Sequence, residues 1–542
     1  MSNAVVSGVP SSEHGPARGS AQRRSAGTPN PDGQAMDLAA IIGLEVHVHL
    51  STTSKLFCGC ANVSAAERSN QFVCPVCMGF PGTLPVTNRR AVEWTILAGL
   101  ALGCRITPRS TFARKSYFYP DLPKGYQISQ YEEPLCLDGQ VHVFLAEGDR
   151  TVRILRVHLE EDAAKNIHTA DATLIDHNRA GTPLIEVVTA PDLRSPAEAG
   201  AFLEDIQRTM RYLGISHADM ENGDLRVDAN ISLRVRGEGT LHPKTELKNL
   251  NSFRAVERAL AYEIKRQTAL WESGTPPTVP STRGWDEAQQ STVAQRLKEG
   301  EADYRYFPEP DIPPLAIEPS LVERLQRSLP ELPHAKEERF RRQYQLPWAD
   351  AHLLVEDRAL AVFAENVFSE LGAWAGERTD VGPRELPHLE KLATNYLLGD
   401  FRTTLSALAV SVTATGATPE NFAELMVMLH RAEVNRNAVR DILRLMAETG
   451  GDPSDIVREH GWSQVSDVEV LRRLVQDVVR EFPSEAEKLR AGKMPVGEFF
   501  VGQVMARTHG RANPAVVRSI LREELGLSAA SDTFSLDTNG ER

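Results

Sequence analysis

Two glutamates in the first half of the chain lie next to or within short apolar segments. Glu160 follows the apolar segment 154–159, and Glu186 lies within the segment 184–188. Both segments are rich in Val, Ile and Leu and too short for helices, which is typical of two strands of a hairpin-like unit. Burying a carboxylate in such a strand is costly, and a hard divalent cation can compensate two converging carboxylates. The alternative is that both acids face solvent on the surface of a sheet.

Residues 41–50 contribute a third acid and an imidazole. Apolar residues alternate there with Glu45 and His47, which predicts a half-buried strand with both polar side chains on one face. We therefore expect this face to join Glu160 and Glu186 around one cation. An edge strand with a hydrated face would show the same alternation.

Four of the six cysteines form two close pairs separated by thirteen residues. Thiol pairs at this spacing are typical of a tetrahedral zinc site, and four thiolates leave no open position for catalysis. The spacing predicts a structural Zn²⁺ module in a reducing compartment, with free thiols as the alternative. The other two cysteines lack such spacing and are predicted to be buried apolar side chains. The four predicted ligands are Cys58, Cys60, Cys74 and Cys77.

The segment 116–130 breaks all periodicity and is rich in aromatic residues and proline. Within it, Lys124 stands beside Gly125, and Tyr126 follows. A rigid loop with exposed rings and one cation suits stacking on a base or ribose and contact with a phosphate. A structured loop that packs on the protein core explains the same composition equally well.

Residues 225–235 show the clearest strand pattern in the chain, with an apolar residue at every second position. The opposite face carries Arg226, Asp228 and Arg234 among short polar side chains. Arginines in this setting suit the floor of a site for an anionic ligand, and a solvated sheet face is the alternative. A further polar segment follows, with Lys248 as its cation.

The order of these elements predicts an α+β fold followed by helical regions. Amphipathic helix patterns at 87–103 and 195–213 accompany the strands of the first domain. Beyond residue 330 strand patterns vanish and apolar residues recur every three or four positions. The expected division is a disordered leader at 1–36, a catalytic domain at 37–329, a helical domain at 330–449, a helical tail domain at 450–527 and a disordered C-terminus at 528–542.

The chain has 542 residues and a formal net charge of −13, which argues against a general nucleic-acid-coating protein. Residues 488–522 reverse this sign, because seven basic residues there accompany a single acid, Glu498. Such a local excess is the footprint expected of an RNA contact, although a solvated helix face has the same composition. No apolar segment is long enough to cross a membrane, and we expect a cytoplasmic protein. The basic residues are Lys488, Arg490, Lys493, Arg507, Arg511, Arg518 and Arg522.

Several ordered motifs resemble those of the B subunits of tRNA-dependent amidotransferases, which act on Glu-tRNA(Gln) and Asp-tRNA(Asn). The resemblance covers residues 37–527 and includes the four cysteines. The other motifs are Gly-Leu-Glu-Val-His at 43–47, Tyr-Phe-Tyr-Pro-Asp-Leu-Pro-Lys-Gly-Tyr at 117–126, His-Leu-Glu-Glu-Asp at 158–162, Asn-Arg-Ala-Gly-Thr-Pro at 178–183 and Lys-Asn-Leu-Asn-Ser-Phe at 248–253.

In that family the B subunit is a kinase that phosphorylates the side-chain carboxylate of the misacylated tRNA with ATP and Mg²⁺. Ammonia released from glutamine by the A subunit, which is a glutaminase, then displaces phosphate, and the small C subunit completes the heterotrimer. The resemblance implies the same ligase activity here, with tRNA(Gln), tRNA(Asn) or both as substrates. It also implies a cradle-shaped catalytic domain related to glutamine synthetase, with an antiparallel sheet and helices, and a tail domain that contacts the tRNA.

The resemblance also implies residue roles. The family's magnesium ligands correspond to Glu45, His47, Glu160 and Glu186, and its zinc ligands to the four cysteines. A carboxylate resists attack by an amine because it is negatively charged and lacks a good leaving group, and phosphorylation supplies that leaving group. The transfer requires Mg²⁺ and positioned cations to screen charge. Candidate substrate- and phosphate-binding residues are Lys124, Tyr126, Arg226, Asp228, Arg234 and Lys248, and candidate tRNA-binding residues are Lys488, Lys493, Arg507, Arg511 and Arg518.

A non-catalytic, zinc-containing scaffold that holds tRNA for another enzyme is the alternative. The acids discriminate between the two functions, because a scaffold has no need of Glu45, Glu160 and Glu186 together. The sequence has no Gly-Ser-Ser amidase signature and no evident Cys-His-carboxylate glutaminase set. If the chain is the kinase, its ammonia must therefore come from a partner.

Overall fold

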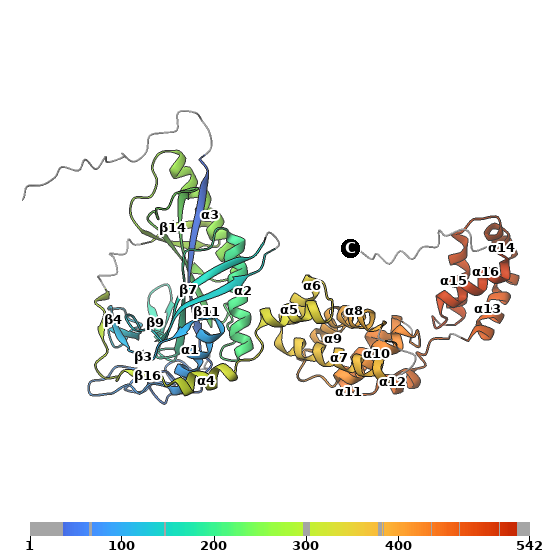
Figure 1. Ribbon diagram of the computed structural model, residues 1–542, viewed down its shortest axis with the longest axis horizontal. Helices are drawn as coiled ribbons and strands as arrows, with labels where there is room; N and C mark the ends of the chain where they lie inside the picture. The colour runs from blue at the N-terminus through green and yellow to red at the C-terminus, as the bar shows by residue number, and fades with distance from the viewer. Residues whose placement is uncertain are drawn as a thin grey trace, which may run out of the picture. The chain divides into compact units, whose positions relative to one another are not determined.

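The computed structural model describes residues 36–63, 68–145, 148–295, 304–377, 382, 384–434, 436–465, 467–508 and 510–527. The chain divides into two compact units (Figure 1). The expected disordered ends, 1–36 and 528–542, lie outside the described residues except for Met36. The first unit consists of Met1–Gln207 and Ser216–Arg327, and the second of Arg208–Ile215 and Ser328–Arg542.

A nine-stranded sheet is the centre of the first unit. In spatial order its strands are β14 (Ser291–Ala294), β13 (Ser281–Asp286), β12 (Thr245–Leu250), β11 (Leu225–Val235), β1 (Leu38–His49), β10 (Pro183–Thr189), β7 (Arg150–Glu161), β6 (Cys136–Val143) and β2 (Arg105–Ile106). Neighbouring strands are antiparallel except for β12 and β13, which are parallel. The predicted acids come from β1, β7 and β10 at the middle of this sheet, so strand pairing brings them together.

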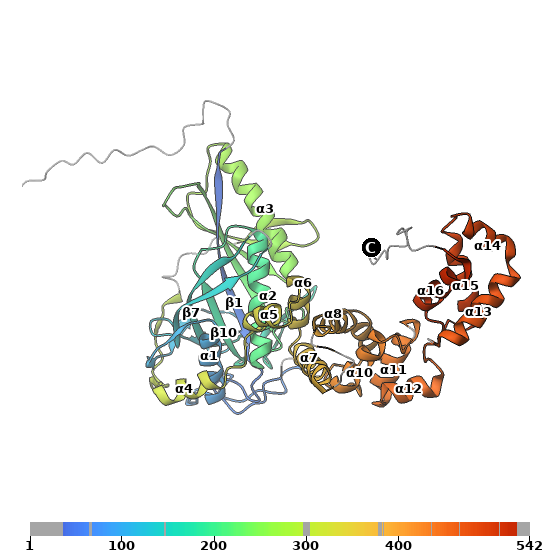
Figure 2. The ribbon, with the colours of Figure 1, turned by 45° about the vertical axis from the view of Figure 1, so that its right-hand side comes forward.

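Alternation of apolar and polar residues decides which face of the sheet is covered. Val46 on β1 lies opposite Val187 on β10, and both are fully buried. Helices α1 (Arg89–Ala101) and α3 (Phe253–Glu272) pack on the sheet, and α2 (Pro196–Leu213) lies beside α3 (Figure 1 and Figure 2). The apolar face is thereby removed from water, which is the main driving force for this packing.

The strongest sequence patterns are confirmed. The strand expected at 225–235 is β11 with the same bounds, and the helix expected at 195–213 is α2. Helix α1 begins after Asn88, whose side chain accepts hydrogen bonds from the backbone N–H groups of Arg90 and Ala91, at 2.9 and 3.4 Å. An N-cap of this kind satisfies amides that have no partner inside the helix, which is why the helix begins there.

Short strands build the surroundings of the polar face. The segment 116–130 is not irregular throughout, because its end forms a strand that pairs with the residues just before the segment. These elements are the three-stranded sheet of β15 (Phe307–Pro308), β4 (Ala113–Ser116) and β5 (Tyr126–Ser129), the pair β16 (Leu315–Ala316) and β3 (Arg109–Ser110), the pair β8 (Lys165–His168) and β9 (Thr173–Asp176), and helix α4 (Pro319–Arg327).

The described part of the second unit is helical, as the sequence predicts, so the chain is a mixed α/β protein with its large sheet confined to the first unit. None of the described helices is long and apolar enough to span a membrane. Its helices are α5 (Pro333–Gln343), α6 (Trp348–Val355), α7 (Arg358–Glu377), α8 (Leu386–Tyr396), the π-helix η2 (Leu397–Phe401), α9 (Arg402–Leu408), α10 (Pro419–His430), the 3-10 helix η3 (Arg436–Ala438), α11 (Val439–Thr449), α12 (Pro453–His460), α13 (Val468–Glu481), α14 (Pro483–Arg490), α15 (Val496–Arg507) and α16 (Pro514–Leu525).

Two separate apolar cores stabilise the described part of this unit, and the point at which they divide differs from residue 450. Ile456 and Val457 of α12 pack in the core formed by the preceding helices, whereas the second core begins with α13. Gly450 ends α11 in a left-handed conformation, with a φ of 71°, and turns the chain into α12. The expected division at residue 450 thus falls within the first of these cores, because a glycine turn inside one core resembles a domain boundary in the sequence.

Candidate functional site

A cavity of about 470 Å³ lies on the polar face of the nine-stranded sheet. Its lining comes from β1, β7, β10, β11 and β12, from β4, and from tyrosines near β15. Six of the residues singled out in the sequence are among those that line it, and five further cationic, acidic or imidazole side chains join them. The full set is Glu45, His47, Lys115, Arg156, His158, Glu160, Glu186, Asp228, Lys244, Glu246 and Lys248.

Strand register places a carboxylate between two imidazoles on this face. His47 on β1 lies opposite Glu186 on β10, and Glu186 lies opposite His158 on β7. Glu160 shares their face because it stands two residues beyond His158. His47 Nε2 lies 3.3 Å from Glu186 Oε2 and 3.9 Å from Glu160 Oε1. His158 Nε2 lies 3.5 and 3.6 Å from Glu186 Oε2 and Glu160 Oε2. The structure thus brings together three of the four side chains that were expected to converge.

The two carboxylates of this group stay ionised although they are buried. Burial opposes protonation of His47, but the hydrogen bond and the charge of Glu186 raise the pKa of His47 overall. Burial alone would raise the pKa of Glu160, yet the hydrogen bond with His158 lowers it. Burial likewise opposes ionisation of Glu186, and the charges of His158 and His47 lower its pKa. Two buried carboxylates that stay ionised form a site that a bound cation would stabilise.

The donor set fits a divalent cation. One ligand atom each of His47, Glu160 and Glu186 lies within 4.8 Å of the other two. Carboxylate oxygens suit Mg²⁺ and Mn²⁺, and an imidazole beside them is common for the transition metals. The hydroxyl of Ser129 donates to Glu160 Oε2 at 2.9 Å and orients that carboxylate, as outer partners of metal ligands do.

Glu45 belongs to a second acidic group in the same cavity. Its ligand atom lies within 4.8 Å of those of Asp228 and Glu246, and Asn230 Nδ2 donates to Glu45 Oε1 at 3.0 Å. Lys248 forms an ion pair with Asp228 and lies 3.0 Å from Glu246 Oε1. The four expected metal ligands are thus divided between two groups, because Glu45 lies opposite Asp228 on β11.

Sequence reasoning missed Lys115 of β4, which lines the cavity. Its ammonium lies 4.9 Å from the ring centroid of Tyr304. Burial would lower the pKa of Lys115, but the charge of Glu160 and other nearby groups raise it, so the lysine stays protonated. Arg114 and Lys115 are neighbours in a strand and point to opposite faces, and the sequence does not say which of them faces the cavity.

Two more lining residues carry a signal that could have identified them. His158 stands two residues before Glu160, and Glu246 stands two residues before Lys248. Residues at this spacing in a strand share a face, so each predicted site residue marks a second position on the same wall.

Aromatic side chains form another wall of the cavity. Tyr131 and Tyr306 stack with their ring centroids 4.3 Å apart. Burial raises the pKa of Tyr306 to about 12, so its hydroxyl stays neutral and able to donate a hydrogen bond. The cavity therefore presents two groups of acids, several cations and a pair of stacked rings to a bound molecule.

Lys124 and Tyr126, which were expected to contact a substrate or phosphate, lie elsewhere. They line a separate cavity of about 230 Å³ that borders the cysteines. Lys124 Nζ forms a buried ion pair with Glu161, and the backbone N–H of Ile128 donates to the same carboxylate at 2.9 Å. The guanidinium of Arg114 lies 4.1 Å from the ring centroid of Tyr126. Both side chains are thus engaged in contacts within the protein, on the lining of the smaller cavity.

Arg226 and Arg234 are not among the described residues that line the larger cavity. Arg226 Nη2 lies 2.6 Å from the buried carboxylate of Asp162. Arg234 lies opposite Ala39, near the other end of β11. Of the three polar residues predicted on this strand as a floor for an anion, Asp228 alone lines the cavity. Arg226 lies opposite the cavity-lining His47 but pairs with Asp162, and Arg234 lies too far along the eleven-residue strand.

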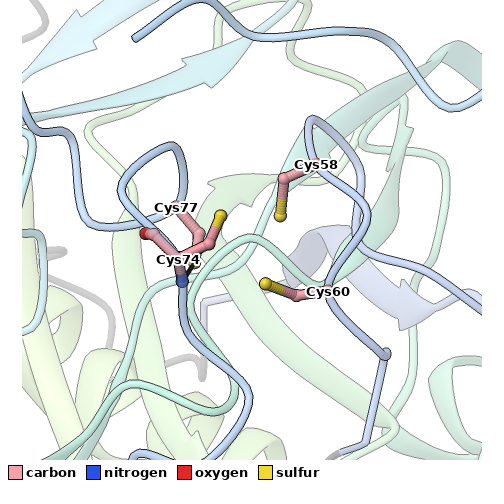
Figure 3. A group of neighbouring side chains, drawn as sticks. All are labelled: Cys58, Cys60, Cys74 and Cys77. Carbon is pink, nitrogen blue, oxygen red and sulfur yellow. Dashed lines mark hydrogen bonds between the residues drawn. The ribbon is translucent and has the colours of Figure 1, made fainter.

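The four predicted zinc ligands converge. Figure 3 shows their sulfurs turned toward one another from two loops. The sulfurs all lie within 4.8 Å of one another, and the backbone N–H of Cys74 donates to Cys77 Sγ at 3.1 Å. A hydrogen bond with Cys58 lowers the pKa of Cys77 to about 5, which makes a thiolate available at neutral pH. This donor set fits a tetrahedral Zn²⁺. It consists of Cys58, Cys60, Cys74 and Cys77.

The basic residues expected to bind tRNA lie on helices α14, α15 and α16 and on the turns between them, and several are paired with acids. Acids just outside the segment 488–522 neutralise part of its positive charge. The backbone carbonyl of Thr508 accepts a hydrogen bond from Arg511 Nε at 3.3 Å. The ion pairs are Lys488 with Glu485 at 2.6 Å, Arg518 with Glu498 at 2.9 Å, and Arg507 with Glu481. An RNA phosphate would have to compete with these carboxylates.

Comparison with known proteins assigns the family. The sequence model of the GatB/GatE catalytic domain matches residues 40–323, and that of the GatB domain matches residues 385–525. The chain is similar to proteins that are named as the B subunit of aspartyl/glutamyl-tRNA(Asn/Gln) amidotransferase. That of Thermomicrobium roseum is 48% identical over 495 residues, covering 90% of this chain and 99% of the relative. Those of Myxococcus xanthus and Thermodesulfovibrio yellowstonii are 44% and 43% identical, each again covering 90% of this chain and 99% of the relative. The chain therefore belongs to the family of aspartyl/glutamyl-tRNA(Asn/Gln) amidotransferase B subunits.

Proposed function

We propose that this protein is the carboxylate-activating component of a tRNA-dependent amidotransferase. It uses ATP to phosphorylate the side-chain carboxylate of Glu-tRNA(Gln), Asp-tRNA(Asn) or both. Ammonia then converts the acyl phosphate into the amide. The observation that carries this proposal is the cavity in which Glu160, Glu186 and His47 converge beside Lys115. A scaffold that only bound tRNA would gain nothing from two ionised carboxylates buried in a cavity.

The reaction has two balanced steps. An oxygen of the substrate carboxylate attacks the γ-phosphorus of ATP, the bond to the β-phosphate oxygen breaks, and ADP leaves. Ammonia then attacks the carbonyl carbon, phosphate leaves with the oxygen that was phosphorylated, and the nitrogen loses a proton. The first step brings two negatively charged groups together, and the second releases a charged phosphate. The cations that line the cavity, Lys115, Arg156, Lys244 and Lys248, stabilise this negative charge.

His47, Glu160 and Glu186 would hold a divalent cation, and the acids around Glu45 are the second place at which one could be held. A divalent cation such as Mg²⁺ supplies charge neutralisation for phosphoryl transfer. The residues of the chain orient the partners: Ser129 fixes the Glu160 carboxylate, and the two imidazoles keep the carboxylates ionised. We propose no phosphate contact for the four candidate residues that lie outside this cavity, which are Arg226, Arg234, Lys124 and Tyr126. The cysteines serve a structural Zn²⁺ in a reducing compartment such as the cytoplasm.

Partners complete the reaction. Relatives are named as the B subunit of an amidotransferase, so we propose a heterotrimer in which the A subunit releases ammonia from glutamine and the C subunit joins the other two. The sequence itself shows neither an amidase nor a glutaminase signature, which fits an ammonia supply from outside this chain. The resemblance to the family implies a glutamine-synthetase-like cradle as the fold of the catalytic domain, and glutamine synthetase also activates a carboxylate by phosphorylation.

The helical tail is proposed to contact the tRNA. Ending the chain after Gln464 removes the second helical core but keeps α12 with the core it packs in. We expect tRNA affinity to fall about tenfold and the slope of log Kd against log salt to flatten by roughly one for each phosphate that the protein no longer binds. Filter binding across a salt series measures both quantities.

A chain that ends at Leu527 is the matched control for this truncation and should bind tRNA like the full-length chain. The result that would exclude a tail contact is an unchanged affinity and an unchanged salt slope for the chain that ends at Gln464.

The complete complex tests the proposed function. The protein, purified with its two partners, is incubated with one misacylated tRNA at a time, ATP and glutamine. We expect amidated aminoacyl-tRNA only when ATP is present, with ammonium able to replace glutamine. Amide formation without ATP, or no amide from either tRNA with an active partner glutaminase, would exclude the proposal.

A further inference from the structure

Lys55 is fully buried, which is unusual for a lysine. It stands three residues before Cys58, and its backbone N–H donates to the carbonyl of Cys60 at 3.0 Å. An ammonium removed from water needs hydrogen-bond acceptors and an opposite charge, or its burial opposes folding. Among the described residues, no carboxylate forms an ion pair with Lys55. In the part of the chain that the structure describes, the negative charge that faces Lys55 therefore belongs to another chemical group.

The ammonium of Lys55 has three acceptors, and one of them is a sulfur. Nζ donates to the backbone carbonyl of Phe72 at 2.8 Å and to that of His177 at 3.3 Å. Its third contact is Cys77 Sγ at 3.9 Å, within the range of a hydrogen bond to sulfur. The two carbonyls satisfy donors but carry no net charge. The thiolates are thus the anions that face this lysine.

These contacts also join the parts of the cysteine site. The backbone of Lys55 holds the loop of the first pair through the carbonyl of Cys60, and its ammonium holds the loop of the second pair through Phe72 and Cys77. His177 belongs to the connection between β9 and β10, so the lysine ties both cysteine loops to the sheet. A single residue thereby links the two pairs, through its backbone N–H to the first and its ammonium to the second.

We propose that Lys55 is a positioning residue of the cysteine site. Its ammonium is the counter-charge of the thiolates and holds the second pair, and its backbone N–H holds the first, around one divalent metal ion such as Zn²⁺. Four thiolates around a divalent ion keep an excess of negative charge. A buried ammonium in contact with one sulfur offsets part of that excess, and its fixed hydrogen bonds keep the sulfurs in place. The proposal concerns the metal site alone and does not depend on the kinase activity.

Removing the charge tests this role. In Lys55→Met the side chain keeps its length and loses its ammonium, and we expect zinc release to excess chelator to become about 10- to 100-fold faster. The full-length chain is loaded with Zn²⁺, and the release is followed with a chromogenic chelator. The matched control is Lys265→Met, the same substitution at an exposed position of α3, which should release zinc at the parental rate.

A second readout separates a role toward the metal from a merely structural one. Zn²⁺ should raise the Tm of the parent chain, and we expect Lys55→Met and Lys55→Gln to reduce this zinc-dependent rise. A structural role alone would lower the Tm of zinc-loaded and zinc-stripped protein equally and leave the difference unchanged.

Lys55→Gln keeps a donor for the carbonyl of Phe72, so it provides the test if the methionine variant does not fold. Parental zinc release together with a parental zinc-dependent rise in Tm, in either folded variant, would overturn the proposal. So would a parent chain that binds no zinc.

Discussion

Replacing Glu160 by glutamine is expected to lower ATP-dependent amide formation about 1,000-fold. The substitution keeps the size of the side chain and removes its negative charge, next to Glu186 and within 3.9 Å of His47. An amide is a weaker ligand for a hard cation than a carboxylate, so the charge neutralisation needed for phosphoryl transfer is lost. The rate of amide formation from misacylated tRNA, ATP and ammonium measures the effect, because ammonium makes the assay independent of the glutaminase.

The affinity for tRNA is the internal control for this variant, since Glu160 lies in the cavity of the first unit and the basic segment lies in the second. Glu272→Gln, the same substitution at the exposed end of α3, is the matched control and should have the parental rate. Glu160→Gln with more than about a tenth of the parental rate would contradict the role assigned to this carboxylate.

The second large effect concerns stability. Asp162→Ala is expected to lower the free energy of unfolding by about 3–5 kcal/mol. Asp162 is buried, and its Oδ2 lies 2.6 Å from Arg226, 2.7 Å from His49 Nε2 and 3.2 Å from Arg179. Removing the carboxylate leaves two guanidinium groups without their anion and the imidazole without its hydrogen-bond partner, which costs more than the pairs contribute. Urea unfolding at pH 7, followed by the transition of the first unit, measures the change.

An exposed pair provides the comparison for Asp162. Asp37 lies 2.9 Å from Arg236, and both side chains are about two-thirds exposed. Asp37→Ala should therefore change the free energy of unfolding by less than about 1 kcal/mol. Equal effects of the two substitutions would show that burial of the Asp162 network contributes nothing.

The same network predicts how stability depends on pH. Burial alone would raise the pKa of Asp162, but the charge of Arg226 and the hydrogen bond with His49 hold it well below its usual value. A carboxylate whose pKa is lowered in the folded state stabilises the protein at pH values above the unfolded-state pKa of about 3.9. This stabilisation is lost as the pH falls below that value. The difference between parent and Asp162→Ala should therefore shrink on acidification below about pH 4.

Local features of the fold could be predicted from the sequence because their signals are local. The alternation at 225–235 identifies a strand, and Asn88 marks the start of a helix. The division of the helical cores could not be predicted, because Gly450 ends a helix whether the next helix joins the same core or another one. Which helices share a core depends on packing between distant residues.

The candidate site shows the same limit. The acids could be identified because a charge in an apolar strand is unusual, and register then brings Glu160, Glu186 and His47 together. The grouping of Glu45 with Glu246 could not be foreseen, since it depends on β12 lying next to β11. The sequence around Lys124 is compatible both with a loop that binds a ligand and with a loop that packs on the protein core. Only the ion pair of Lys124 with Glu161 in the folded chain favours the packed loop. Long-range strand order leaves little trace in any single segment.

Isotope transfer tests the central claim, that the side-chain carboxylate is phosphorylated in the cavity. The complete complex is supplied with Glu-tRNA(Gln) or Asp-tRNA(Asn) whose side-chain carboxylate oxygens are labelled with ¹⁸O, together with ATP and glutamine, and the released phosphate is analysed by mass spectrometry. The account predicts that each phosphate carries one labelled oxygen, because that oxygen attacked the γ-phosphorus. Amide formation accompanied by unlabelled phosphate would contradict it.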